Sequence, residues 1–199
     1  MFNTINLQKI KSIFLYGLFL SIFIFGFSFL TVKASTSDTV SGYAWSENIG
    51  WISFNCTDTN NCNASPYGVT IASGGAISGY AWSDNIGWIS FNASDVAGCP
   101  NGTCASSFNS TTGKVTGWAR ALSGNTAQSG GWDGFISLSG NGESKYGISI
   151  DSNCNWSGYA WGSTVVGWIS FGGVGGGDVS GCGDEPRYTY SDWTIVNVI

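Results

Sequence analysis

Two segments of the chain carry the same alternation of large apolar residues with small or polar ones. Residues 41–55, SGYAWSENIGWISFN, recur at residues 78–92 with Asp84 in place of Glu47 as the one change. A weaker copy opens at Thr116 and closes at Leu138 around a Gly- and Ser-rich insertion, and a further copy runs over residues 157–171. Alternation with a period of two is typical of β-strands, and repeat starts at 41, 78, 116 and 157 are typical of repeat architectures.

Each copy predicts a β-hairpin whose two faces differ in character. With Ser46–Ile49 as a four-residue turn, Tyr43 lies opposite Ile52 and on the same face of the sheet. We therefore expect a core face made of Tyr43, Trp45, Ile52 and Phe54. The other face would carry Gly42, Ala44, Trp51 and Ser53. Asn48 is the turn residue that we expect in the left-handed conformation.

The later copies depart from this pattern in two places. One more residue separates Trp161 from Gly167 in the fourth copy, which predicts a longer or bulged turn. In the third copy Arg120 stands where the first has Trp45, so its inner face is not expected to pack in the same way.

A shorter strand, here called a leader strand, is predicted before each of the later hairpins. Residues 67–71 and 146–150 alternate and lead through turn residues into the next copy, and residues 107–109 do the same before the third. The first copy has no such leader, yet the chain ends in the β-branched run 193–199. We expect this run to complete the first unit, with insertion into a neighbouring molecule, and hence self-assembly, as the alternative.

These elements predict an all-β fold. It is an array of about four three-stranded antiparallel meander units, closed by the C-terminal strand. A barrel, a sandwich and a propeller-like ring all remain compatible with that array.

The N-terminal segment has the features of an export signal. Lys9 and Lys11 precede a nearly continuous apolar run, and Val32-Lys33-Ala34 offers a small-residue cleavage site. We expect residues 1–34 to be a signal peptide and residues 35–199 a single secreted or cell-surface domain. The apolar run 13–32 is also long enough to span a bilayer, so an uncleaved membrane anchor is the alternative.

All six cysteines lie in the exported part of the chain. An even number of cysteines in an oxidising compartment is typical of disulfides. Cys56 with Cys62 and Cys99 with Cys104 are close in sequence and fall in corresponding loops, which leaves Cys154 with Cys182. A metal cluster is the alternative, but the chain has no Cys-x-x-Cys spacing and no His.

The composition argues against several classes of function. Without His, the chain has no Ser-His-Asp or Cys-His catalytic arrangement and no His-ligated metal site, and no cofactor is indicated. Its 12 acidic residues against 7 basic ones argue against binding to a nucleic-acid backbone. The acids stand at hairpin tips or in turns, with no spacing that fixes a catalytic pair, so we do not expect an enzyme.

The repeated GYAWSxNIGWISF sequence, with residues 131–140 and 158–171, resembles Trp-rich repeat proteins that candidate-phyla bacteria are predicted to export. The likeness covers about residues 41–173. It implies a location at the bacterial surface and brings no established activity with it.

Four aromatic rings on the second face of the hairpins are the candidate binding residues. They occupy equivalent places among small neighbours: Trp51, Trp88, Phe135 and Trp168. Such rings either stack on a surface glycan or grip another protein subunit, or they pack adjacent units together. We expect an exported, non-catalytic repeat protein with a structural or adhesive role, and a carbohydrate-binding module as the alternative.

Overall fold

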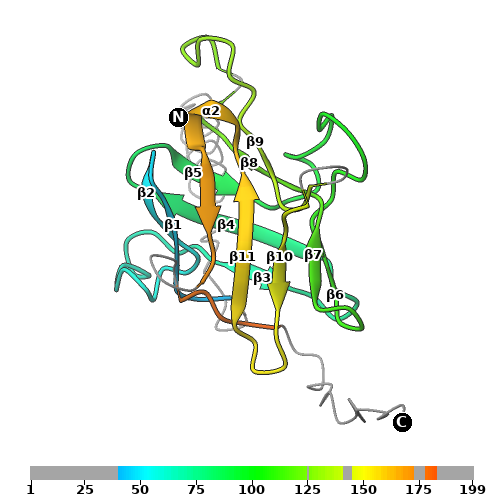
Figure 1. The fold of residues 1–199 in the computed structure, drawn as a ribbon. Coiled ribbons are helices and arrows are strands. Elements are labelled where there is room, and N and C mark those ends of the chain that lie inside the picture. Colours follow the sequence, from blue (N-terminus) through cyan, green and yellow to red (C-terminus); the bar gives the residue numbers. More distant parts are fainter. Residues whose placement is uncertain (1–39, 125, 141–144, 173–177, 183–199) are drawn as a thin grey trace, which may run out of the picture. The chain divides into compact units, whose positions relative to one another are not determined.

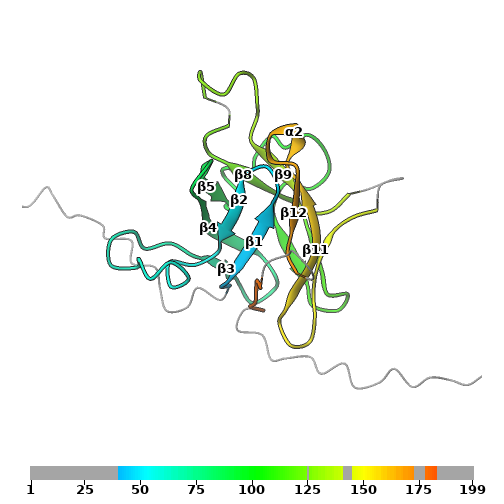
Figure 2. The same cartoon turned by 60° about the vertical axis from the view of Figure 1, so that its left-hand side comes forward.

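The computed structural model of this protein describes residues 40–124, 126–140, 145–172 and 178–182. Within them, eight antiparallel strands close into a β-barrel built from four hairpins (Figure 1). The hairpins are β1 (Tyr43–Ser46) with β2 (Gly50–Ser53), β4 (Ile77–Ser83) with β5 (Gly87–Ser90), β8 (Trp118–Ala121) with β9 (Phe135–Ser137), and β11 (Trp156–Trp161) with β12 (Trp168–Ser170). Figure 2 shows β12 beside both β11 and β1, where its pairing with β1 closes the ring. The predicted all-β fold is confirmed, in its barrel form.

Short additional strands extend the barrel strands. β3 (Val69–Ile71) pairs with the start of β4, and β10 (Ile148–Ile150) pairs with the start of β11. β6 (Ser107–Asn109) pairs with β7 (Lys114–Thr116), which is followed directly by β8. β3, β6 and β10 are the three predicted leader strands, so the meander expected within each later repeat is confirmed.

The first repeat receives its leader from the other end of the described chain. Ser180 bridges Ser41 on one side and Asn155 on the other, and Ser41 and Ser180 exchange two backbone hydrogen bonds of 2.9 Å. Val179 is buried in the core, as Val69 of β3 is. Residues 178–180 thus pair beside the first repeat and complete it. The sequence predicts this role for residues 193–199, which lie outside the described residues.

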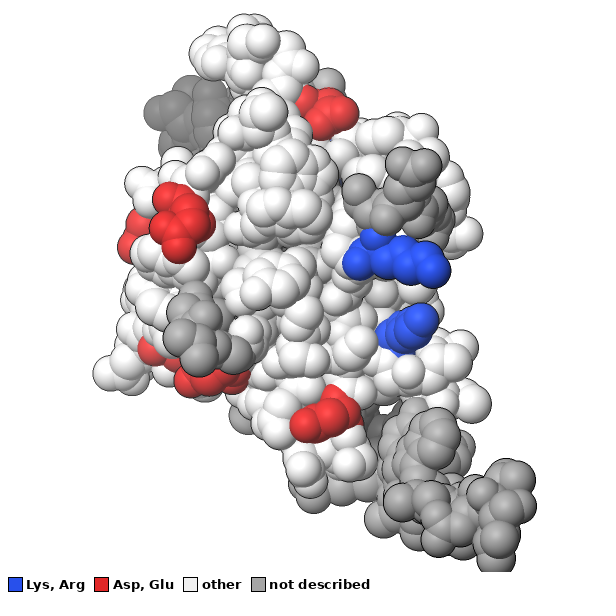
Figure 3. Space-filling model, viewed as in Figure 1, with Lys and Arg blue, Asp and Glu red and all other residues white. Residues whose placement is uncertain are grey.

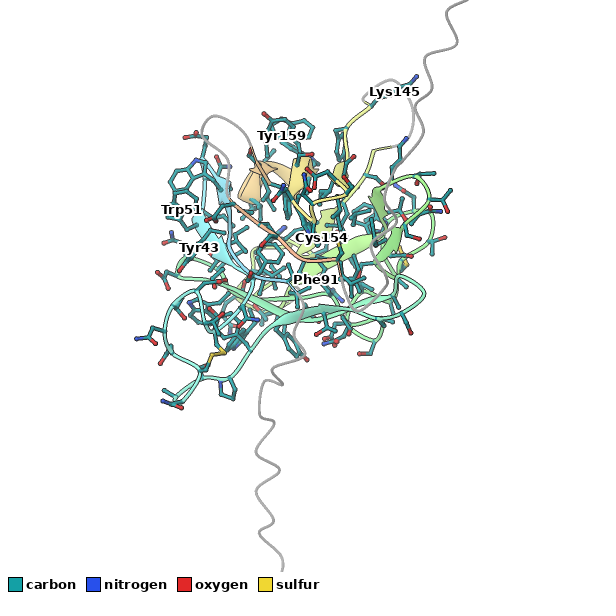
Figure 4. The ribbon with its side chains drawn as sticks, turned by 90° about the horizontal axis from the view of Figure 1, so that it is seen from below. Tyr43, Trp51, Phe91, Lys145, Cys154 and Tyr159 are labelled. Carbon is teal, nitrogen blue, oxygen red and sulfur yellow. A yellow bond between two sulfur atoms is a disulfide. The ribbon has the colours of Figure 1, made fainter. Side chains whose placement is uncertain are left out.

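The barrel interior is filled by layers of equivalent residues, one from each hairpin. Twelve residues, each at most 2% exposed, form three such layers: Ala44, Ala81, Ala119 and Ala160; Ile52, Ile89, Ile136 and Ile169; Phe54, Phe91, Leu138 and Phe171. Small alanine and larger isoleucine, phenylalanine and leucine side chains together fill the narrow interior of the barrel. In Figure 4, Phe91 lies inside the ring of strands and Trp51 lies outside it.

The predicted register of the hairpin is wrong by one residue. Tyr43 pairs with Ser53, and Trp45 pairs with Trp51, so the turn contains three residues rather than four. A one-residue slip exchanges the faces of a strand. Ile52 therefore faces the core as predicted, but Tyr43 and Trp45 are only partly buried on the outer surface, and Ala44 takes their place inside.

Gly50 is the reason for the shorter turn. Its φ of 71° lies in the left-handed region, and Gly87 repeats it with a φ of 74°. A three-residue hairpin loop commonly ends in such a glycine, which forms a bulge. Asn48, predicted to be left-handed, does not have a positive φ. Its amide instead donates to the carbonyl oxygens of Thr164 and Val165.

The hairpin tips are linked to one another by such hydrogen bonds. The Asn85 amide donates to the Ile49 carbonyl at 3.0 Å, and the Ser123 hydroxyl donates to the Ile86 carbonyl at 2.7 Å. The fourth tip is α2 (Ser163–Val166), a single helical turn that confirms the predicted longer connection. The asparagine of each NIG sequence therefore ties its own hairpin to the neighbouring one.

Replacing Asn85 with Ala is expected to lower the free energy of unfolding by about 1 kcal/mol, because the Ile49 carbonyl loses its side-chain donor. Urea unfolding followed by tryptophan fluorescence measures the change. Asn101→Ala is the control, since Asn101 is exposed and only its backbone carbonyl is used, as the acceptor for Trp118. Equal stability of the two variants would contradict the role assigned to Asn85.

Three disulfides connect the loops in the predicted pairs, Cys56–Cys62, Cys99–Cys104 and Cys154–Cys182. The third anchors the segment that completes the first repeat. Three disulfides in so small a domain indicate an oxidising, extracytoplasmic environment. The predicted export signal and the apolar run 13–32 lie outside the described residues, within which no helix has the length and hydropathy of a membrane span.

Candidate functional site

The outer surface of the barrel carries one cluster of large side chains per hairpin. Two residues of the first strand and one of the second make up each cluster: Tyr43, Trp45 and Trp51; Tyr80, Trp82 and Trp88; Trp118, Arg120 and Phe135; Tyr159, Trp161 and Trp168. In the first, second and fourth clusters the two Trp rings lie 4.8, 4.6 and 4.8 Å apart between centroids. They meet at an angle, as aromatic pairs prefer.

Small residues of the adjacent hairpin make room for these rings. Trp82 pairs across the strands with Ser53, and Trp45 pairs with Ser170. The serine that follows isoleucine therefore borders an indole ring of the adjacent hairpin in three repeats, and in the second repeat Ser90 borders Arg120.

The four predicted binding rings lie on the non-core face, but their exposure differs. Trp51 and Trp168 are 54% and 48% exposed, Trp88 is half-buried, and Phe135 is only 7% exposed. Each ring contacts an aromatic ring of its own hairpin. Three of the four are therefore accessible in part, and the third repeat differs from the rest.

In the third repeat, Arg120 covers the ring that the others expose. Its guanidinium carbon lies 4.4 Å from the Phe135 centroid, and its nitrogens donate to the carbonyls of Asp133 and Asp95. Because Arg120 is on the outer face, the prediction that it disturbs the inner face is wrong. The inner face of this repeat carries Ala119 and Ile136, as in the other copies.

The second repeat combines its aromatic cluster with a polar cleft of about 370 Å³. The Cys56–Cys62 loop and the second hairpin form its walls. Three rings line it, Tyr67, Trp82 and Trp88, and five polar residues do so as well: Thr59, Asn60, Asn61, Ser65 and Asp84. Aromatic surface with a few convergent polar groups is the usual composition of a small-molecule site.

Hydrogen bonds hold the aromatic wall of this cleft in place. The Trp82 indole N–H donates to Asp84 Oδ1 at 2.8 Å, which orients both groups. The Tyr67 ring meets Trp88 edge-on at 5.4 Å, and the Tyr67 hydroxyl hydrogen-bonds Ser53 at 2.7 Å. The rings are therefore fixed before any ligand arrives, which lowers the entropy lost on binding.

The loop opposite the rings is fixed as well. Besides the disulfide, Asp58 joins the loop to the barrel, since its carboxylate accepts from the backbone N–H groups of Gly42 and Asn55, both at 2.9 Å. Tyr43 donates its hydroxyl to the Asp58 carbonyl at 2.6 Å. Partial burial raises the pKa of the Tyr43 hydroxyl, and the negative charge of Asp58 raises it further, so this donor stays protonated.

The fourth repeat has an equivalent set of four rings. Tyr146 precedes β10 as Tyr67 precedes β3, and it meets Trp168 edge-on at 5.0 Å. Tyr159 lies 6.4 Å from Trp168, as Tyr80 lies 6.3 Å from Trp88. The second and fourth repeats thus share one aromatic arrangement.

The described carboxylates mostly serve local structure. Asp151 accepts from the backbone of Asn153 and Asn155, and these bonds lower the pKa of its carboxyl although desolvation alone would raise it. Asp133 accepts from the Phe135 N–H, and Asp178 accepts from the Tyr43 N–H. No group of three potential metal-ligating side chains occurs among the described residues.

Sequence reasoning missed most of the cleft around Trp88. The register error placed Trp82, the equivalent of Trp45, on the core face. The sequence could not place Asn60 and Asn61 beside Trp88, because the disulfide loop positions them. The Tyr-Gly pair that opens two leader strands, at Tyr67 and Tyr146, was the available signal. No protein-family model, curated protein or solved structure matches this chain, so the chemistry of the cleft is the basis for a functional proposal.

Proposed function

We propose that this protein is an exported, non-catalytic glycan-binding protein with an adhesive role at the bacterial surface. The cleft between the Cys56–Cys62 loop and the second hairpin is the observation that carries the proposal. The disulfides, the predicted N-terminal export signal and the resemblance to Trp-rich repeat proteins that are predicted to be exported support the location.

The cleft suits a sugar because a pyranose ring has two kinds of surface. Its C–H face is apolar and stacks on indole, which Trp88 and Trp82 supply, whereas its hydroxyl rim requires hydrogen-bond donors and acceptors. Asn60 and Asn61 offer both, and Asp84 keeps Oδ2 for a sugar hydroxyl because the indole contact uses Oδ1.

A protein partner is the second candidate, favoured by the rings of Trp51 and Trp168. Both are about half exposed, and no described residue accepts a hydrogen bond from either indole. Exposed Trp is enriched where proteins meet. The run 193–199 supplies the related hypothesis of strand exchange between copies, and native mass spectrometry of the chain without residues 193–199 tests it.

Trp88→Ala is expected to weaken binding of a neutral oligosaccharide at least about tenfold, equivalent to about 1.4 kcal/mol. A glycan array of the secreted protein selects the oligosaccharide, and titration calorimetry measures the affinity. Trp51→Ala is the matched control, because Trp51 has the same place in its hairpin but does not line the cleft. An array without bound glycans, or equal affinity of the Trp88→Ala variant and the parent, would contradict the proposal.

A further inference from the structure

A second hollow lies beside the fourth repeat, where the aromatic arrangement of the second repeat recurs. It has a volume of about 720 Å³, and Tyr146 and Tyr159 form part of its wall. Tyr146 corresponds to Tyr67, which lines the cleft of the second repeat. The two hollows therefore share an aromatic element but border different polar residues.

Two lysines distinguish the second hollow from the first. Lys114 of β7 pairs with Ser149 of β10, and Lys145 directly precedes Tyr146. Both lysines line the hollow. The hydroxyl-bearing residues Thr116, Ser139 and Ser149 lie on the same wall. The cleft of the second repeat contains Asp84 and no lysine.

The charge around this hollow is unusual for the molecule. The described residues contain three basic side chains, Lys114, Arg120 and Lys145, and Arg120 is held over Phe135. Figure 3 shows the basic residues of this face close together, with the acidic residues set apart from them. Both lysines are exposed, and neither has an ion-pair partner among the described residues.

An anionic ligand gains the most binding free energy from cations that no neighbouring carboxylate already neutralises. Two ammonium groups that no described carboxylate neutralises offer charge-assisted hydrogen bonds to an anionic group in this hollow. The domain as a whole is acidic, so its net charge would repel an anionic polymer and the attraction must come from this hollow. Figure 4 labels Lys145 and Tyr159, the residues that bring charge and an aromatic ring to it.

We propose that this hollow is a second glycan site that selects an acidic sugar, with Lys114 and Lys145 binding the carboxylate of a uronic acid. Tyr159, 52% exposed, packs against the sugar ring, and the hydroxyl groups of Thr116 and Ser149 meet the sugar hydroxyls. The proposal rests on the glycan-binding function and adds a substrate class and a separate location. No covalent step is involved.

The test compares a galacturonic-acid oligosaccharide with its methyl ester, which has the same sugar rings without the charge. The secreted protein is expected to bind the acid form, and to bind it at least tenfold more weakly after Lys114→Gln with Lys145→Gln. The ester is expected to bind at least tenfold more weakly than the acid, and raised salt is expected to weaken only the acid form. Both lysines are exposed, so near-ultraviolet circular dichroism should show an unchanged fold.

The Trp88→Ala variant separates this proposal from the neutral-glycan site. It is expected to bind the acid oligosaccharide as the parent does, because Trp88 lies outside the lysine hollow. The proposal is overturned if the parent does not bind the acid form, if the double lysine variant binds it equally well, or if the ester binds as tightly. Binding of a sulfated sugar in preference to the uronic acid also overturns the carboxylate assignment.

Discussion

Gly79→Ala is expected to lower the free energy of unfolding by about 3 kcal/mol or more, through backbone conformation and steric overlap together. Gly79 has a φ of 97°, and an added Cβ would collide with the Gly68 carbonyl oxygen just before β3. That oxygen accepts the Tyr80 N–H at 2.9 Å, so relieving the collision means separating β3 from β4. Thermal unfolding by circular dichroism measures the loss.

The matched control for this substitution is Gly74→Ala. Gly74 has almost the same φ, 94°, but an added Cβ there would meet nothing within 4 Å. This control is expected to cost only the backbone penalty, about 1–2 kcal/mol. A loss for Gly79→Ala no larger than that for Gly74→Ala would show that the strand contact is not the cause.

The second large effect is expected from Phe54→Ala, with a loss of about 3–5 kcal/mol in the free energy of unfolding. Phe54 is 1% exposed, and its ring lies 5.9 Å from Phe91, 5.7 Å from Phe171 and 5.9 Å from Trp156, measured between centroids. Removing it opens a cavity where the first, second and fourth hairpins meet, and three rings lose contacts together.

Urea unfolding of Phe54→Ala and of Leu122→Ala measures this effect against a control. Leu122 is 39% exposed, and its replacement is expected to change stability by no more than about 0.5 kcal/mol. If Phe54→Ala unfolds at the urea concentration of the parent, the layered core described above is wrong. A Phe54→Leu variant should recover most of the loss because it refills much of the cavity.

Local pattern was sufficient to predict the strands but not their register. In residues 41–55 both faces of the hairpin carry residues that can be buried. Tyr43 and Trp45 lie on one face, and Ala44 lies on the other. The length of the turn determines which set of side chains faces the core, and Gly50 determines that length. Arg120, at the position of Trp45, was a usable signal because a charged residue there favours the outer surface.

The candidate rings were predicted on the correct face, but the site around them was not. Trp88 lines the cleft as one of eight residues, and its neighbours come from a loop whose position depends on a disulfide and on Asp58. Such contacts are formed by tertiary structure and leave no periodic pattern. The lysine hollow was missed for the same reason, because the pairing of β7 with β10 brings Lys114 to a hollow that Lys145 also lines.

The way the first repeat is completed has a consequence for folding. Ser41 and Ser180 are 139 positions apart in the chain. The pairing of the first repeat is therefore complete only when residues 178–180 have docked beside it. Contacts this distant in sequence slow folding, because a long loop must close before they form. All four hairpins must be synthesised before β12 can pair with β1, and Cys182 follows β12 in the chain, so the oxidation of Cys154 with Cys182 is a late event in maturation.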